Sequence, residues 1–179
     1  MDIQGTTTIE DAFHVDSGLT YEGAATSVVS GLWHLEGKMV NTLADGAVIS
    51  QQAVSNGKIS LPKASTKVHV GLPITADLQT LPISLEMEAF AQGRQKNVNK
   101  AWLRVYRSSG IKVGPTFDKL TEVKQRTTQP YGSPADLLSE EVSVMITPTW
   151  SDGGQICVRQ TDPLPLSILS MVVDVALGG

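Results

Sequence analysis

One stretch of the chain places basic and aromatic residues at every second position: Lys100, Trp102, Arg104 and Tyr106. Residues two apart in a β-strand point to the same face, so these side chains are expected to share one surface. Arg, Trp and Tyr are favoured in protein interfaces, and aromatic residues interleaved with basic ones also bind single-stranded nucleic acid. We expect a subunit interface here, with a plain solvated strand face and a nucleic-acid surface as the alternatives.

Residues suited to catalysis or metal binding do not occur in patterns that favour either role. The histidines His14, His34 and His69 are scattered, and neither His-x-x-x-His nor Cys-x-x-Cys spacing is present. No Gly-x-Ser-x-Gly elbow occurs. Glu86 and Glu88 would share a face of a strand and could serve a glycosidase, although a solvated face is the commoner role of such a pair. We therefore expect no enzyme, no cofactor and no metal site.

Composition narrows the class of protein further. Of the 179 residues only 18% are charged, below the usual level of about 25%, and the net charge is −4. An acidic balance argues against a general nucleic-acid binder. The single cysteine, Cys157, lies in an alternating segment and is expected to be a buried or half-buried thiol. Because no apolar run is long enough for a membrane span and the N-terminus lacks the features of a signal peptide, we expect synthesis in a cytoplasm.

Period-two alternation of apolar residues predicts an all-β fold with very little helix. It is clearest at 67–70, at 101–106 and at 142–146, where Pro148 also predicts an edge or terminating strand. Four turn dipeptides mark candidate hairpins, and the first two predict a compact meander of short strands over 38–72. These dipeptides are Asp45-Gly46, Asn56-Gly57, Ser109-Gly110 and Asp152-Gly153.

Other segments carry weaker expectations. Residues 85–92 could form two helical turns, and 134–141 could form one short helix with Ser133 as its cap. The C-terminal segment is predicted to be an apolar core strand that follows a bend fixed by two prolines. Its predicted core residues are Ile168, Val172, Val173, Val175 and Leu177.

The predicted organisation has three parts. An N-terminal extension covers 1–11, a small β-barrel or meander domain covers 12–84, and a β-sandwich-like domain with longer strands covers 85–179. A loop rich in Thr, Pro and Gly at 126–134 interrupts the last part, and such a loop could reach a neighbouring subunit. The candidate assembly residues are Trp102, Arg104, Tyr106, Pro130 and Tyr131.

Seven colinear stretches resemble one family, the tail nozzle proteins (tail tubular protein B) of short-tailed phages and prophages. The resemblance is to the C-terminal part of these proteins and covers nearly the whole chain. It rests on stretches that define turns and strands rather than catalytic sites. These stretches are 9–21, 32–38 (Leu-Trp-His-Leu-Glu-Gly-Lys), 43–46, 68–73, 78–82, 105–115 and 158–166.

The resemblance implies a structural protein of the virion, assembled as a ring around the channel through which DNA leaves. It implies partners among other tail proteins and copies of itself, DNA that passes without specific binding, and a location in the virion tail after synthesis in a bacterial cytoplasm. One alternative is a tail module that binds a glycan or host surface through exposed Trp33, Trp102 or Trp150. A less favoured alternative is the glycan-cleaving enzyme.

Overall fold

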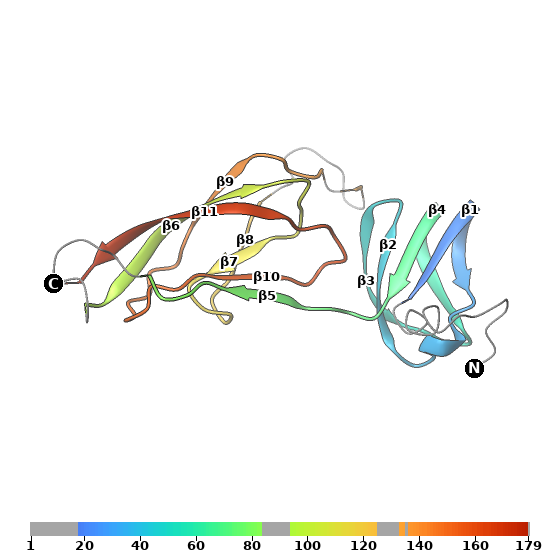
Figure 1. Cartoon of the computed structure of the whole chain (residues 1–179). Coiled ribbons are helices and arrows are strands. Elements are labelled where there is room, and N and C mark those ends of the chain that lie inside the picture. Colours follow the sequence, from blue (N-terminus) through green and yellow to red (C-terminus); the bar gives the residue numbers. More distant parts are fainter. Residues whose placement is uncertain (1–17, 84–93, 125–132, 135, 179) are drawn as a thin grey trace, which may run out of the picture. The chain divides into compact units, whose positions relative to one another are not determined.

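The computed structural model describes residues 18–83, 94–124, 133–134 and 136–178. The chain divides into two compact units, residues 1–74 with 128–135 and residues 75–127 with 136–179, and each is described by itself below. Apart from one 3-10 turn, η2 (Trp33–Leu35), the regular elements of the described residues are strands (Figure 1). The expected all-β fold with very little helix is confirmed.

The first unit is built on one antiparallel sheet with the strand order β1-β4-β2-β3. This order is not that of the predicted meander, because β4 lies between β1 and β2 rather than beside β3. Nor are the strands all short, since β1 has 12 residues and β4 has 14, both longer than any strand of the second unit. The strands are β1 (Leu19–Ser30), β2 (Met39–Ala44), β3 (Ala47–Ala53) and β4 (Lys58–Gly71).

Two tight turns of the first unit follow the sequence prediction. Asp45 and Gly46 have φ angles of 46° and 82°, and Asn56 and Gly57 have φ angles of 53° and 65°. Two successive positive φ angles are the mark of the two-residue hairpin turn that these dipeptides favour. After the second turn only Ser55 and Lys58 pair as a bridge. The chain then diverges, which is why β4 is free to join β1 and β2.

A side chain links β3 to the first half of β4, where the two strands are not paired. The Gln52 Nε2 donates to the Ser60 carbonyl oxygen at 3.0 Å, and the Ser60 N–H donates to Gln52 Oε1 at 3.3 Å. The carboxamide thus occupies the place that a main-chain peptide group of another strand would take. The strands of this sheet curve around its core (Figure 1). That core comprises Val29, Leu32, Leu35, Val40, Ala44, Val54, Ile59, Leu61, Val68 and Val70.

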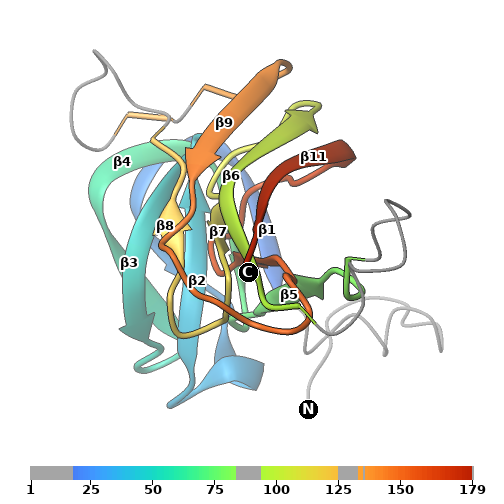
Figure 2. The ribbon, with the colours of Figure 1, turned by 90° about the vertical axis from the view of Figure 1, so that its left-hand side faces the viewer.

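The second unit contains two antiparallel sheets around one shared core, a β-sandwich-like arrangement (Figure 2). The first sheet has the order β5-β10-β7-β8 and the second the order β11-β6-β9. Both sheets contribute buried side chains, such as Val113 and Val158 from one and Leu103 and Val144 from the other. The strands are β5 (Ala76–Gln79), β6 (Lys96–Val105), β7 (Lys112–Gly114), β8 (Thr121–Glu122), β9 (Glu141–Met145), β10 (Cys157–Gln160) and β11 (Ile168–Leu177).

Two of the predicted hairpins are wrong, because their dipeptides connect strands of different sheets. Ser109-Gly110 leads from β6 to β7, and Asp152-Gly153 leads from β9 to β10. At the first crossing the Ser108 hydroxyl accepts a hydrogen bond from the Ser167 N–H at 2.8 Å. This buried contact ties the crossing to the start of β11.

The short helix predicted at 134–141 is also absent from the described residues of that segment. Leu138 instead forms an isolated bridge with Ser108, exchanging two backbone hydrogen bonds of 3.0 and 2.9 Å. These bonds use the same N–H and C=O groups that a helix would need. The helix considered at 85–92 lies outside the described residues.

The C-terminal strand β11 differs from the predicted uniform core strand. It is an edge strand of its sheet, and its residues alternate between the two sides. Val172 is 59% exposed and Leu177 is 40% exposed. Val173 and Val175 pack against the core but remain only partly buried. The segment carries apolar residues on both sides, because neither side lies wholly in solvent or wholly against the core.

Candidate functional site

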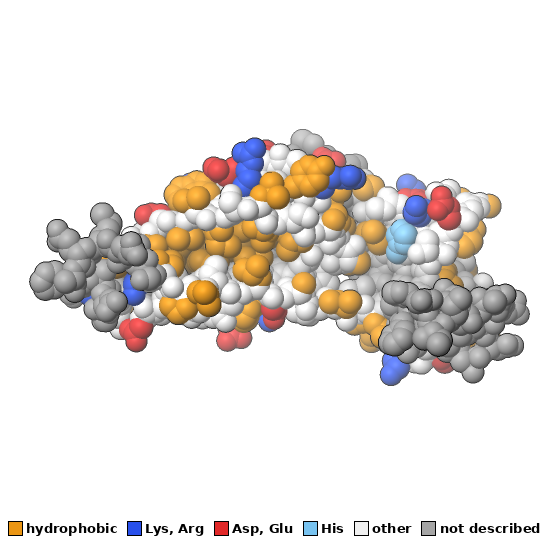
Figure 3. Space-filling view, in the orientation of Figure 1, with side chains coloured by type: hydrophobic (Ala, Val, Ile, Leu, Met, Phe, Trp, Pro, Cys, Tyr) orange, Lys and Arg blue, Asp and Glu red, His pale blue; other side chains and the backbone are white. Residues whose placement is uncertain are grey.

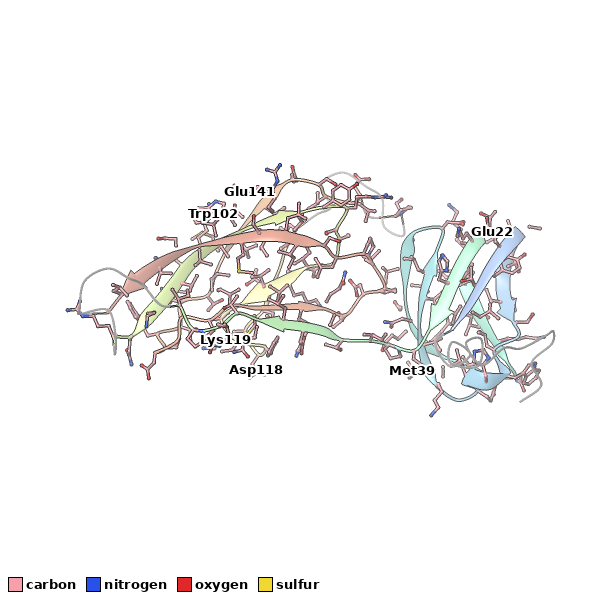
Figure 4. All side chains as sticks on the ribbon, viewed as in Figure 1. Glu22, Met39, Trp102, Asp118, Lys119 and Glu141 are labelled. Atoms are coloured by element: carbon pink, nitrogen blue, oxygen red, sulfur yellow. The ribbon has the colours of Figure 1, made fainter. Side chains whose placement is uncertain are left out.

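The outer face of the sheet β11-β6-β9 gathers the residues singled out in the sequence. The strand register places Trp102 between Val172 and Ser143, Arg104 between Ser170 and Glu141, and Lys100 between Asp174 and Met145. We name these nine residues the Trp102 face. Figure 4 shows Trp102 and Glu141 on the side of the second unit that faces away from β5 and β10.

Opposite charges flank the tryptophan on both sides of its row. Arg104 lies directly across from Glu141, and Lys100 lies directly across from Asp174. Opposite charges facing one another across strands stabilise a sheet modestly, whereas like charges would destabilise it. The Lys100 Nζ also lies 4.8 Å from the centroid of the Trp102 ring, within the range of a cation–π contact. The face therefore has an aromatic centre with charges of both signs around it.

Of the described candidate residues, the register places Trp102 and Arg104 on this face, while Tyr106 is not among its nine residues. Trp102 is half-buried, Arg104 is exposed and Tyr106 is 54% exposed. Tyr106 lies just beyond the end of β6, where its N–H donates to the Ser167 carbonyl oxygen at 3.0 Å. Pro130 and Tyr131, the remaining candidate residues, lie outside the described residues.

Among the members of the face that sequence reasoning missed are two apolar residues, Met145 and Val172. They are 69% and 59% exposed, and they add apolar surface beside Trp102 and Lys100. Met145 lies on the same side of β9 as Ser143, and nothing in the sequence indicated that this side meets the side of β6 that carries Trp102. Only the pairing of β9 and β11 with β6 brings the three segments together. An apolar centre rimmed by charges is the composition of a protein contact surface.

The outer face of the other sheet is held by an internal ion pair. The Arg159 Nε and Nη2 donate to the two carboxylate oxygens of Asp77 at 2.7 and 2.8 Å, and the guanidinium lies 4.8 Å from the centroid of the Phe117 ring. The Arg159 hydrogen bonds hold the pKa of Asp77 below its usual range. Burial, and then the charge of Asp77, raises the pKa of the Cys157 thiol. Cys157 is buried, as expected, and its raised pKa disfavours it as a thiolate nucleophile.

Another exposed aromatic residue, Trp33, lies on the first unit. It is 68% exposed, although its ring lies against the backbone of Gly57. A Cβ at Gly57 would lie 2.5 Å from Cδ2 of the indole, so only glycine permits this approach. One face of the ring is thus fixed while much of the side chain remains open to solvent.

The described residues contain no group of three or more His, Cys, Asp or Glu side chains placed to hold a metal ion. Glu86 and Glu88, the carboxylate pair considered for a glycosidase, lie outside the described residues. Within the parts of the chain that the structure describes, no helix has the length and apolar character required to cross a membrane.

The sequence matches no protein-family model, and no curated protein matches it significantly. The tail nozzle family therefore stays a prediction that rests on the sequence stretches given above.

Proposed function

We propose that this chain is a structural component of a phage virion, part of the tail nozzle through which DNA leaves, and that it acts by contacts with other subunits. The observation that carries the proposal is the Trp102 face. It offers a half-buried aromatic centre, neighbouring exposed apolar side chains and charges of both signs. Residues of this kind carry most of the binding energy in protein interfaces.

The stretches that resemble the family support the proposal through the positions they occupy. In 32–38, Glu36 accepts backbone hydrogen bonds from the turn at Asn56-Gly57. In 158–166, the buried Gln160 side chain donates to the carbonyl oxygens of Ser109 and Leu164 at 2.9 and 2.7 Å. These side chains hold turns and strand crossings in place. A part of a tail wall needs this kind of rigidity, and it needs little affinity for the DNA that passes, which suits the net charge of −4.

The proposed partners are copies of the chain in a ring and the neighbouring tail proteins, and the proposed location is the virion tail. The test is to delete the coding region from the phage or prophage that carries it and to examine the particles by electron microscopy. We expect DNA-filled heads that lack a complete tail and do not infect. Infectious particles of normal composition without this chain would overturn the proposal.

Complementation then tests the Trp102 face itself. A Trp102→Ala chain should be incorporated into particles at least about tenfold less well than the wild type, the loss expected of a hot-spot residue. Trp150→Ala is the matched control, since Trp150 is exposed but does not belong to the face. Equal incorporation of the Trp102→Ala chain would show that the Trp102 face is not an assembly contact. It would not change what the deletion experiment says about the whole chain.

A second candidate function, glycan or host-surface binding by a tail module, is favoured by Trp33. An indole fixed against Gly57 and exposed over 68% of its surface suits stacking with a sugar ring. Protection of tryptophan fluorescence from quenching by host-surface oligosaccharides, lost in Trp33→Ala, would support this function. No change in quenching with any host glycan would reject it.

A further inference from the structure

The two edges of the sheet β11-β6-β9 are unequal. The β9 edge has five residues, begins with Glu141, and its inward side chains Val142 and Val144 are buried, at 9% and 5% exposure. The β11 edge has ten residues, and Asp174 is its one charged residue. A long, largely apolar edge strand with a single charge and no proline is open to pairing with another strand.

The sandwich is also incompletely closed on the β11 side. Strand β5, the edge of the opposite sheet, lies on the same side as β11 (Figures 1 and 2). All four residues of β5 are exposed, including Leu78, which pairs with the core residue Val158 and is 47% exposed. Hydrophobic side chains gather on the second unit over the region between β11 and β5 (Figure 3). Along the β11 edge the inward side chains Met171, Val173 and Val175 are thus only partly buried.

We propose that β11 pairs with β11 of a second copy of this chain, antiparallel about a two-fold axis at Val172. The two sheets then join into one sheet of twice the width. The row of Ser143, Trp102 and Val172 continues into the same row of the second copy. The partly buried inward side chains of β11 in the two copies also meet across the axis. Apolar surface is therefore buried on both sides of the joined sheet.

The residue pattern of β11 favours this register. The pairing of β11 with β6 is interrupted between Ile168 and Ser170 and again between Asp174 and Val175, which leaves a regular segment from Ser170 to Asp174 centred on Val172. With Val172 opposite itself, Asp174 faces Ser170 of the second copy and Met171 faces Val173 of the second copy. No like charges oppose each other, and outward residues meet outward residues.

The β9 edge of another copy is a poorer occupant, because the inward side chains of β9, Val142 and Val144, are already buried. A two-fold contact uses the same edge on both copies and stops at two subunits, whereas a ring needs two different contact surfaces. The proposed pairing is therefore separate from the ring contact and does not depend on the place of the chain in a tail.

The test is the mass of the purified full chain by light scattering and sedimentation, as wild type and as Val172→Lys. We expect the wild type at twice the 19.1 kDa of one chain and Val172→Lys as a monomer, because two lysines would then lie about 5 Å apart at the axis. Val172 is exposed, so the substitution leaves the core intact. The matched control is Met145→Lys, at a somewhat more exposed apolar position on the same face but on β9. The Met145→Lys chain should remain a dimer.

A charge-complementation step tests the register. Val172→Asp should also be monomeric, and a mixture of Val172→Lys and Val172→Asp chains should restore the dimer, because the opposite charges then face each other at the axis. A monomeric wild type, an unchanged mass for Val172→Lys, or failure of the mixture to dimerise would overturn the inference. Loss of the dimer in Met145→Lys would assign the contact to β9 or to the whole Trp102 face, and would overturn it as well.

Discussion

The carboxylate of Glu36 accepts a hydrogen bond of 2.7 Å from the backbone N–H of Gly57, and one of 2.9 Å from the neighbouring N–H of Asn56. The positive φ angles at Asn56 and Gly57 turn two successive N–H groups in one direction, which creates a small anion-binding concavity. The Leu32 N–H also donates to the Gly57 carbonyl oxygen at 3.0 Å. The segment around η2 is therefore fastened to a hairpin turn by charge and by main-chain bonds.

Replacing Glu36 by Gln should destabilise the first unit by about 1 kcal/mol, because a neutral carbonyl can replace only part of a carboxylate that accepts two N–H bonds. Urea unfolding followed by circular dichroism measures the change. Glu140→Gln is the control, since it removes an exposed carboxylate in the second unit. Equal effects of the two substitutions would show that the bonds to the turn contribute nothing specific.

Gly57→Ala should cost more than the positive φ alone requires. Gly37 has a similar φ of 72°, and a Cβ there would meet nothing within 4 Å, so Gly37→Ala measures the backbone cost, about 1 kcal/mol. At Gly57 the added methyl group would also displace the Trp33 ring. We expect the loss of stability to exceed that of Gly37→Ala by about 1–2 kcal/mol.

A double substitution isolates the contribution of the Trp33 ring. In a Trp33→Ala background the methyl group at position 57 meets no indole, so Gly57→Ala should then cost no more than Gly37→Ala. The free energies of unfolding of the four chains in this cycle give the coupling energy. A coupling energy of zero would show that the ring and Gly57 do not constrain each other.

Gly114 is required for a different reason, since its φ is not positive but its Cα lies against the chain that follows. A Cβ there would overlap the carbonyl oxygen of Lys119. Gly114→Ala should therefore displace the segment after β7, from which the Pro115 carbonyl oxygen contacts the Cys157 Sγ at 3.9 Å. We expect the thiol, buried and raised in pKa in the wild type, to react at least about tenfold faster with a thiol reagent.

The control for this experiment is Gly153→Ala. A Cβ at Gly153 would meet only the flexible Gln155 side chain, at 3.2 Å. Its thiol reactivity should equal that of the wild type. An unreactive Cys157 in a folded Gly114→Ala chain would mean that the segment after β7 does not shield the thiol.

The local features of this fold could be predicted from the sequence, and the distant pairings could not. The alternation at Val68 and Val70 and the turns at Asp45 and Asn56 depend on neighbouring residues, and the structure contains them as predicted. The pairing of β6 with β11 joins Val105 to Ile168, and no local pattern specifies such a partner. For that reason the sequence predicts a hairpin at Ser109-Gly110, where the chain instead crosses from one sheet to the other.

The candidate site shows the same division. The shared side of Trp102 and Arg104 follows from period two alone, whereas the addition of Val172 and Met145 requires the register of three strands. The expectation that Val172 belongs to the core was wrong because an apolar edge strand can carry apolar residues on both sides. An exposed Val at a sheet edge is a signal that only the fold reveals.

The Asp45 carboxylate gives the first unit a pH dependence of known sign. It accepts hydrogen bonds from the Lys67 N–H at 2.8 Å and from the Thr66 N–H and hydroxyl, and the Lys67 bond is the main reason that its pKa lies below the usual value. A lowered folded-state pKa stabilises the fold above the unfolded value of about 3.9, and the contribution is lost as the pH falls through the folded-state pKa.

Asp45→Asn keeps a residue that tolerates positive φ but removes the charge. The substituted chain should therefore be less stable than the wild type at neutral pH, and the stabilities of the two chains should converge below about pH 3.9. The control is Asp152→Asn, in an exposed turn of the second unit, which should leave the stability of the first unit unchanged. Urea unfolding at stepped pH measures this convergence, and a constant difference between wild type and Asp45→Asn at all pH values would show that the turn depends on the shape of the side chain rather than on its charge.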